Sequence, residues 1–409
     1  MQKTTLANGL EIIYIPQKST SVTVQIMVKI GSAIEKPEEL GLAHFLEHIL
    51  FEGTPKRPNS FLIANEIEKV GGAFNAYTTH ERTCYYAKVP KKHFKSTLNV
   101  LSDIIQHPLF QKESVEKEKK VVLKEIDMVH DDAHSLQWIE LQKELYPNSK
   151  SLHPTYGTKK IVQNLTPKKI ATFFKTYYHP KNITIAIVGE VKNWKKEVET
   201  VFETGHGIIK TTPPCSQVPL TKSSTRKISK DMSSCHIVLG FRAVKRSNPD
   251  SYVLDVIDAI LGRGQSGKMF QQVRGEHGLA YEVGTSNVCD KEYGYFAVYA
   301  VVDPSKKEKT EQVIVEVLNT LNQVTKKELS EAKTYLEGEY LLDLEDTQKV
   351  ADQILFWDQV ESYTKADEYV KNIKQVTIQD ITRVTAKYLQ KYAKVVIEKK
   401  NKKKKAKKK

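Results

Sequence analysis

The chain has 409 residues, of which 40% are hydrophobic, and a formal net charge of +14. This length and apolar content allow two domains, each with its own core, and exclude a disordered chain. No run reaches the roughly 18 apolar residues of a membrane span and the amino terminus lacks a signal-peptide layout, so we expect a cytoplasmic protein without a membrane span.

The segment GLAHFLEHILFEGT, residues 41–54, predicts the first helix of interest. Glu38 and Glu39 favour a helix start because acids interact well with the positive end of the helix dipole, and Gly53 favours an end. The sequence therefore predicts a helix of about 14 residues here.

Two histidines share one face of this predicted helix. His44 and His48 are four residues apart, so they project from the same side, and Glu47 lies beside them. Two imidazoles so placed can bind one zinc ion, and an adjacent carboxylate that is not a ligand can take a proton from water. The order is H-x-x-E-H, the reverse of the commoner H-E-x-x-H. Ordinary histidines on a half-buried face are the alternative as long as no third ligand is found.

A strand is predicted shortly afterwards, in the sequence GGAFNAYT. Its glycine pair breaks the preceding helix, and Asn75, Ala76 and Tyr77 begin the strand. The composition alone favours an internal strand of the core.

A third metal ligand could come from the next long helix, which we predict over residues 113–132. Glu118 and Glu125 are seven residues apart in it, and two turns place them on one face. One could bind zinc while the other orients a ligand through a hydrogen bond. Solvated acids in a lysine-rich helix are the alternative that the periodicity leaves open.

The rest of the chain repeats one plan. Residues 165–189 and 376–398 each contain a threonine cap, an amphipathic helix and a β-branched strand. Residues 71–104 and 278–321 each contain a glycine, a strand, a polar turn, an aromatic-rich strand and a helix. Because both pairs have a similar separation, the sequence predicts two copies of one α+β domain.

The predicted domains are a first copy that carries the histidine motif (1–205), a linker rich in Pro, Ser, Thr and Gly (206–225), a second copy (226–398) and a disordered lysine-rich tail (399–409). The strands come as hairpins followed by helices, so each domain should be an antiparallel sheet with helices packed on one face.

The tail explains most of the net charge. It contains nine lysines and no acid, and removing these nine charges from +14 leaves +5 on the rest of the chain. We expect a solvated tail that aids solubility, or a weak contact with nucleic acid or an acidic surface. No aromatic residues are interleaved with the lysines, which disfavours specific nucleic-acid recognition.

From Asn8 to about residue 398, these motifs closely resemble those of the pitrilysin/insulysin zinc metallopeptidases. The size and the two copies are similar to the short branch, which includes mitochondrial processing peptidase subunits and bacterial relatives. The resemblance implies a half-clamshell fold and one Zn²⁺ per chain. It assigns His44, His48 and Glu125 as the zinc ligands, Glu47 as the general base and Glu118 as an acid that orients a ligand.

The resemblance also implies how a substrate is held. The strand that begins at Asn75, Ala76 and Tyr77 matches a sheet edge to which the substrate peptide adds as an extra strand. In the second copy, VRGEHGLAYEV matches the family's arginine and tyrosine pair, here Arg274 and Tyr281, which would stabilise an anionic intermediate.

The family divides this site between two halves, and this chain has the length of one half. The resemblance therefore implies a homodimer with two composite sites, or a heterodimer with an inactive homologue. GRGQSG at 262–267 fits a GxGxxG motif but follows a helix instead of a strand, so we do not expect dinucleotide binding.

The expected function is a zinc endopeptidase that hydrolyses peptides or unfolded segments in an enclosed dimer chamber. The alternatives are a noncatalytic structural or processing-complex subunit and a binding protein that contacts RNA or an acidic surface through its basic tail.

Overall fold

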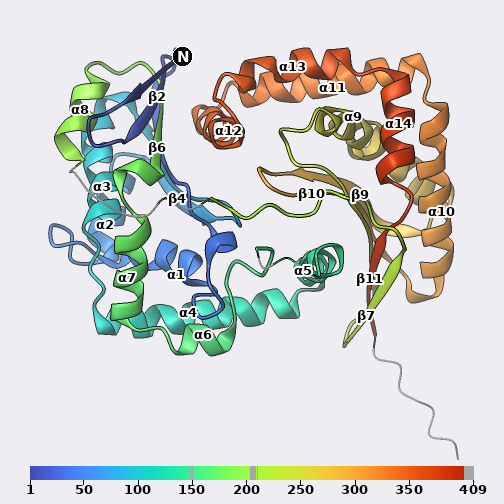
Figure 1. Cartoon of the computed structure of the whole chain (residues 1–409), viewed down its shortest axis with the longest axis horizontal. Coiled ribbons are helices and arrows are strands. Elements are labelled where there is room, and N and C mark those ends of the chain that lie inside the picture. Colours follow the sequence, from blue (N-terminus) through green and yellow to red (C-terminus); the bar gives the residue numbers. More distant parts are fainter. Residues whose placement is uncertain (148, 150, 203–208, 210, 400–409) are drawn as a thin grey trace, which may run out of the picture. The chain divides into compact units, whose positions relative to one another are not determined.

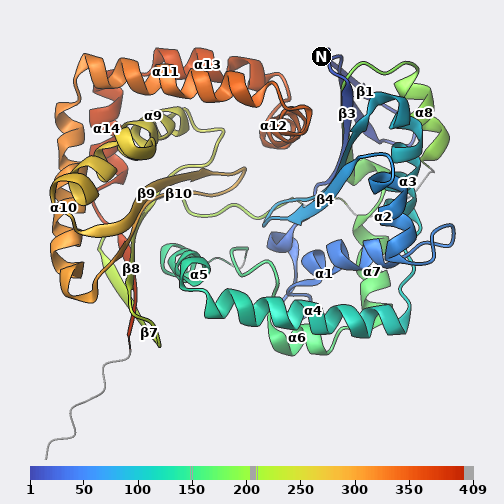
Figure 2. The same cartoon turned by 180° about the vertical axis from the view of Figure 1, so that it is seen from behind.

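The structure is a computed structural model that describes residues 1–147, 149, 151–202, 209 and 211–399 (Figures 1 and 2). Part of the predicted linker and the predicted tail beyond Lys399 lie outside these residues. The chain forms two compact units, and neither is continuous in sequence. The first contains Met1–Met128, Ser149–Pro213 and Tyr340–Ala366, and the second contains Val129–Asn148, Pro214–Glu339 and Asp367–Lys409.

The first unit is built on a six-stranded sheet with the strand order β1-β2-β6-β3-β5-β4. The order places β4 at one edge of the sheet, beside β5. The strands are β1 (Gln2–Thr5), β2 (Glu11–Ile15), β3 (Ser21–Val28), β4 (Ala73–Thr78), β5 (Thr83–Pro90) and β6 (Ile183–Val188).

The second unit has a five-stranded sheet with the order β7-β11-β8-β10-β9, so that β9 lies at an edge. Its strands are β7 (Ser224–Lys230), β8 (Cys235–Arg242), β9 (Ala280–Cys289), β10 (Gly294–Val302) and β11 (Ala393–Lys399). The two sheets share a plan, because β4 and β5 in the first match β9 and β10 in the second. This match confirms the two predicted α+β copies.

The helices of the chain follow the same repeat. Thr166 caps α7 before β6 and Thr377 caps α14 before β11, each accepting a backbone N–H through its side chain, as the repeat predicts. The first half contains α1 (Leu42–Ile49), α2 (Ser60–Glu68), α3 (Phe94–Gln106), α4 (Lys112–Asp131), α5 (Ala133–Leu145), α6 (Lys159–Gln163), α7 (Pro167–Tyr177) and α8 (Trp194–Val201). The second half contains α9 (Asp250–Gly262), α10 (Lys307–Asn319), α11 (Lys326–Asp343), α12 (Thr347–Val360), α13 (Lys365–Gln375) and α14 (Ile378–Tyr388).

The two halves exchange one helix. Helix α12, from the second half, packs on β3 and β6 in the first unit, and α5, from the first half, packs on β8 and β11 in the second. Thr23 of β3 hydrogen-bonds Thr347 of α12 over 2.8 Å, and Gln25 donates to Asp352 over 2.8 Å. Because α12 belongs to the first compact unit and α5 to the second, the compact units differ from the predicted homologous segments.

The exchanged helices correct one detail of the predicted fold. Side chains alternate along a strand, so Ile237, Leu239 and Phe241 of β8 face the core beneath α9, α10 and α14, whereas Gly240 faces Leu141 of α5. Helices therefore cover both faces of the sheet, instead of one. The same holds for the first sheet, where every residue of β6 is buried, including the polar Thr184.

A second correction concerns strand direction. Most neighbouring strands are antiparallel, as predicted, but β2 pairs with β6 and β7 pairs with β11 in parallel. Parallel neighbours need a long connection between them, and in both copies the paired strands are far apart in sequence. Hairpin patterns reveal local pairs only, so these two distant pairs could not be predicted from them.

Among the residues that the structure describes, no helix is long and apolar enough to cross a membrane. The predicted cytoplasmic location stays a prediction.

Candidate metal centre

The helix that carries the histidine motif is fixed at its first turn by a buried acid. Helix α1 begins at Leu42, later than predicted, because Gly41 adopts a left-handed φ of 92° just before it. The two side-chain oxygens of Glu35 accept the N–H groups of Gly41 over 2.8 Å and of Ala43 over 2.7 Å. Glu35 therefore satisfies donors that a helix start leaves unpaired, whereas the sequence predicted a start at Glu38 and Glu39 through their interaction with the helix dipole.

Burial of one helix face places the chemistry on the other. Leu42, Ala43, Phe45, Leu46 and Ile49 of α1 are all buried. This leaves His44, Glu47 and His48 on the side away from the core.

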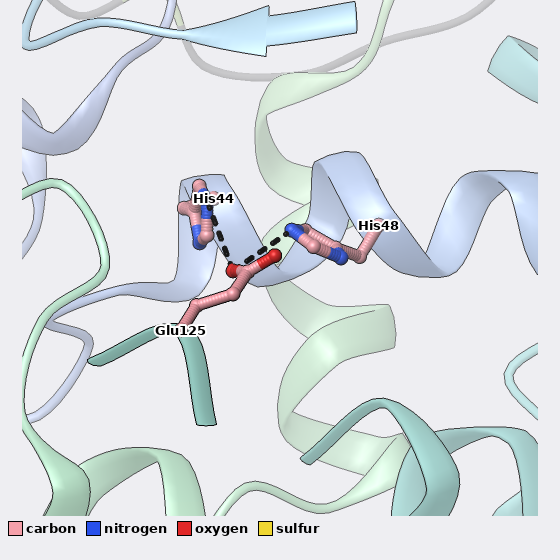
Figure 3. Close-up of side chains that lie close together, drawn as sticks. All are labelled: His44, His48 and Glu125. Atoms are coloured by element: carbon pink, nitrogen blue, oxygen red, sulfur yellow. Dashed lines mark ion pairs between the residues drawn. The ribbon is translucent and has the colours of Figure 1, made fainter. Parts of the chain in front are cut away.

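Both histidines approach a carboxylate on α4 (Figure 3). Glu125 Oε2 lies 3.5 Å from His48 Nε2 and 3.9 Å from His44 Nε2, and the ring centroids of the histidines are 4.7 Å apart. One ligand atom from each of the three residues lies within 4.8 Å of the others. This is the one such group of three or more metal-ligating side chains in the described part of the chain.

Glu118, two turns before Glu125 on α4, lies on the other side of His48. Its Oε2 is 3.3 Å from His48 Nδ1, whereas Glu125 is near Nε2. A carboxylate at one ring nitrogen fixes the orientation of the ring and leaves the other nitrogen for a metal. His44 differs from His48, because its buried Nδ1 has no hydrogen-bond partner among the described residues.

The pKa values of the two histidines shift in opposite directions. Burial, with a smaller effect of the neighbouring His48, lowers the pKa of His44 to about 3. Burial also opposes the charging of His48, but the hydrogen bond to Glu118 and the charges of Glu125 and Glu47 outweigh it and raise the pKa of His48 above its ordinary value. A metal needs the neutral imidazole, which His44 already provides.

The carboxylate of Glu47 lies beside the two histidines and is held by a threonine. Thr78, at the end of β4, donates its hydroxyl proton to Glu47 Oε2 over 2.6 Å. Burial raises the pKa of Glu47, and the bond from Thr78 and the charge of His48 partly offset this shift. A carboxylate with a raised pKa is better suited to accept and return a proton near neutral pH.

The predicted strand at Asn75 is present as β4, and it is an edge strand. The Ala76 amide donates to the side chain of Asn75 over 2.8 Å. On the next residue, Tyr77 hydrogen-bonds Asp352 of α12. The strand thus lies beside α1 at one face and is tied to α12 at the other.

Arg274 and Tyr281 belong to the second unit. Arg274 is exposed, with its guanidinium carbon 5.0 Å from the ring centroid of Phe270. Tyr281, in β9, is 67% exposed, which is unusual for a tyrosine and leaves its hydroxyl accessible. Their predicted role in catalysis stays a prediction.

Sequence reasoning missed two residues of this site, Glu35 and Thr78. Thr78 follows Asn75, Ala76 and Tyr77 directly. A threonine at the end of a strand, where it caps no helix, gives little indication of a role in a site. Glu35 carries no signal at all, because its partners are backbone groups of a helix start that the sequence places elsewhere.

Comparison with known proteins gives a consistent result. Residues 12–159 match the insulinase family (peptidase family M16), and residues 164–336 match the peptidase M16 inactive domain. A protein of Bacillus subtilis (strain 168), named as the uncharacterized zinc protease YmxG, is 31% identical over 351 residues, which cover 85% of each chain. An uncharacterized zinc protease of Streptomyces coelicolor is 31% identical over 403 residues, 94% of this chain and 86% of its own.

Solved structures show the same fold. A protease from Helicobacter pylori has a TM-score of 0.91, with 22% identity, over 97% of this chain and 99% of its own. A peptidase M16 inactive domain from Pseudomonas fluorescens has a TM-score of 0.87, with 19% identity, over 98% of each chain. The fold and the paired helices with their two histidines and acid define the class of M16 metallopeptidase-like proteins. The chain belongs to the insulinase family, peptidase family M16.

Proposed function

We propose that this protein is a zinc-dependent endopeptidase that hydrolyses peptides or unfolded protein segments. The observation that carries the proposal is the approach of His44, His48 and Glu125 to within 4.8 Å, with Glu47 beside them. Two imidazole nitrogens and one carboxylate are a donor set of catalytic zinc sites, and His44 is neutral because burial lowers its pKa to about 3. The residues present therefore fit one Zn²⁺ per chain.

Bound at these three residues, zinc would polarise the scissile carbonyl and lower the pKa of water. Glu47 takes the proton that water loses and delivers it to the leaving amine. Glu118 holds the ring of His48 through Nδ1, so that Nε2 keeps its direction toward Glu125. Arg274 or Tyr281 stabilises the negative charge that develops on the carbonyl oxygen.

The edge strand β4 supplies the means of holding a peptide. We propose that a substrate adds to β4 along Asn75, Ala76 and Tyr77, because an edge strand offers main-chain donors and acceptors to any extended peptide. Binding through the main chain requires an extended substrate. Short unstructured peptides should therefore be cleaved, whereas exposed loops of a stable folded protein should resist.

We further propose that the active form is a homodimer that encloses a chamber, in which Arg274 and Tyr281 of one chain serve the metal centre of the other. The test mixes Glu47→Gln with the double variant Arg274→Ala, Tyr281→Ala after reversible dissociation. Half of the randomly assorted dimers are then mixed, and each contains one intact composite site, so about a quarter of the sites regain activity. No recovery despite proven exchange of subunits contradicts the shared site.

The experiment that tests the activity itself uses a mixed pool of peptides. The purified protein is incubated with the pool alone, with a chelator, and with zinc restored after chelation, and the cuts are read by mass spectrometry. We expect internal cuts that chelation abolishes and zinc restores. The absence of cuts in all three samples would favour a noncatalytic subunit. The protein could instead capture nucleic acid. Capture that weakens with salt and is lost when residues 399–409 are removed would favour the basic tail as the functional element.

A further inference from the structure

The bond between Thr78 and Glu47 joins the proposed substrate strand to the proposed base. Thr78 is the last residue of β4, and Glu47 is on α1. The hydroxyl oxygen of Thr78 is 2.6 Å from Glu47 Oε2, the short distance expected when a hydroxyl donates to an ionised carboxylate. The two groups are 31 positions apart in the chain, so only the tertiary fold brings them together.

The strand fixes the direction of this hydroxyl. Successive side chains of a strand point to opposite faces, and Tyr77 bonds Asp352 of α12 while Thr78 bonds Glu47 of α1. The end of β4 is therefore held from both faces. A threonine on such a strand has little freedom about χ1, because two heavy atoms on Cβ restrict its rotamers.

A second acceptor lies near the Thr78 hydroxyl but competes poorly for its proton. Thr83, the partner of Thr78 across the β4–β5 pair, has its hydroxyl oxygen 3.4 Å away. Thr83 is fully buried and donates its own proton to the Ile30 carbonyl over 2.9 Å. The single proton of Thr78 thus goes to the nearer, charged acceptor, Glu47.

We infer that Thr78 is a positioning residue for Glu47, an inference that rests on the proposed function. Its hydroxyl holds Oε2, fixes the plane of the carboxylate and leaves Oε1 as the oxygen that exchanges a proton with water. Because Thr78 ends the strand to which we propose that peptides add, the base is oriented by the same element that holds the substrate. The main effect of losing this bond is on the chemical step, since the main-chain groups that bind the peptide are unchanged.

The kinetic test compares three variants. Thr78→Val keeps the shape of the side chain without the hydroxyl, Thr78→Ser keeps the hydroxyl, and Thr83→Val removes the neighbouring hydroxyl on β5 as a matched control. We expect Thr78→Val to lower kcat about tenfold to a hundredfold with KM within about twofold, as for other groups that orient a catalytic residue. Thr78→Ser should restore most of kcat, and Thr83→Val should keep kcat even if its Tm falls. Zinc content should be unchanged in all three.

Unchanged kcat in Thr78→Val, or an equal loss in Thr78→Ser, would overturn the inference. If the wild-type protein cleaves no peptide, the proposed function fails, and a second measurement still tests the contact. In metal-free protein labelled at threonine methyl groups, the Thr78 resonance should shift in Glu47→Ala and stay unshifted in Glu116→Ala, which removes an exposed acid of α4. A Thr78 methyl that does not respond to Glu47→Ala would refute the bond itself.

Discussion

The two halves of this chain build the same scaffold and place different chemistry on it. In the first half, α1 and α4 bring His44, His48, Glu118 and Glu125 together. In the second half, α9 and α11 occupy the matching positions in the order of elements, and neither contains a histidine. The core pattern of a helix fixes one face only, so its other face is free to gain or lose a metal centre without changing the fold.

The two halves also depend on each other through the exchanged helices. Helix α12 ties the first sheet through Thr347 and Asp352, and α5 faces the second sheet through Leu141. Each sheet therefore needs a helix from the opposite half, although the halves differ in function. A half of the chain expressed alone would expose one face of its sheet.

Removing a metal ligand in the first half should have the most severe consequence. His48→Ala or Glu125→Gln should lose both bound zinc and peptide hydrolysis, because a catalytic zinc site depends on three protein ligands. Glu339→Gln is the matched change in the second half, because Glu339 is at the same position in α11 as Glu125 is in α4, and it should keep both. Bound zinc is measured by atomic absorption, and hydrolysis is measured as peptide turnover. Zinc retained in Glu125→Gln but lost in Glu118→Gln would mean that the two acids of α4 have the opposite roles.

A smaller loss is expected when the acid that orients His48 is changed. Glu118→Gln should weaken zinc binding about tenfold to a hundredfold while the three ligands remain. The exposed Glu116 on the same helix bonds Lys119 alone among the described side chains, so Glu116→Gln is the control and should bind zinc normally. Competition with a chelator of known affinity gives both constants. Equal affinities in the two variants would exclude a role for Glu118.

The edge strand gives the next test. Ala76→Pro removes a main-chain donor in the middle of β4 and should raise KM about tenfold, the effect of one or two lost hydrogen bonds. Ala73→Pro changes the first residue of the same strand, where proline is tolerated, and should change KM little. Steady-state kinetics with one fluorogenic peptide distinguish the two. A normal KM in Ala76→Pro would show that peptides bind elsewhere.

The smallest effect concerns the buried acid that starts α1. Burial raises the pKa of Glu35 to about 8 from an ordinary 4.5, against the opposing hydrogen bonds of the Ala43 and Gly41 amides. A carboxyl whose pKa is higher in the folded state stabilises the fold when protonated, so this stability is complete below about pH 4.5 and is lost as the pH rises through 8. Glu35→Gln should lower Tm but flatten its decline between these values. If Tm of Glu35→Gln fell as steeply with pH as that of the wild type, the pH dependence would arise from other groups.

The side chains of the candidate metal centre could be predicted from the sequence, whereas the contacts that hold its helices in place could not. Spacing along a helix predicts which side chains share one face, and the four residues concerned lie on two helices. The structure brings all four together: His44, His48, Glu118 and Glu125. The helix start was wrong because Glu35 caps α1 from six residues before Gly41, through a loop whose path no spacing rule gives. The parallel strand pairs and the exchanged helices depend on contacts between distant segments, which periodicity does not report.

A paired assay of Glu47→Gln, in which hydrolysis and bound zinc are determined on the same sample, decides whether Glu47 is the general base. The amide cannot accept the proton, but no ligand is lost, so we predict turnover about a hundredfold to ten-thousandfold below wild type, the usual contribution of general-base catalysis. Zinc should stay near one per chain. Substantial turnover in Glu47→Gln, with zinc still bound, would contradict the assignment of Glu47 as the base and with it the proposed mechanism.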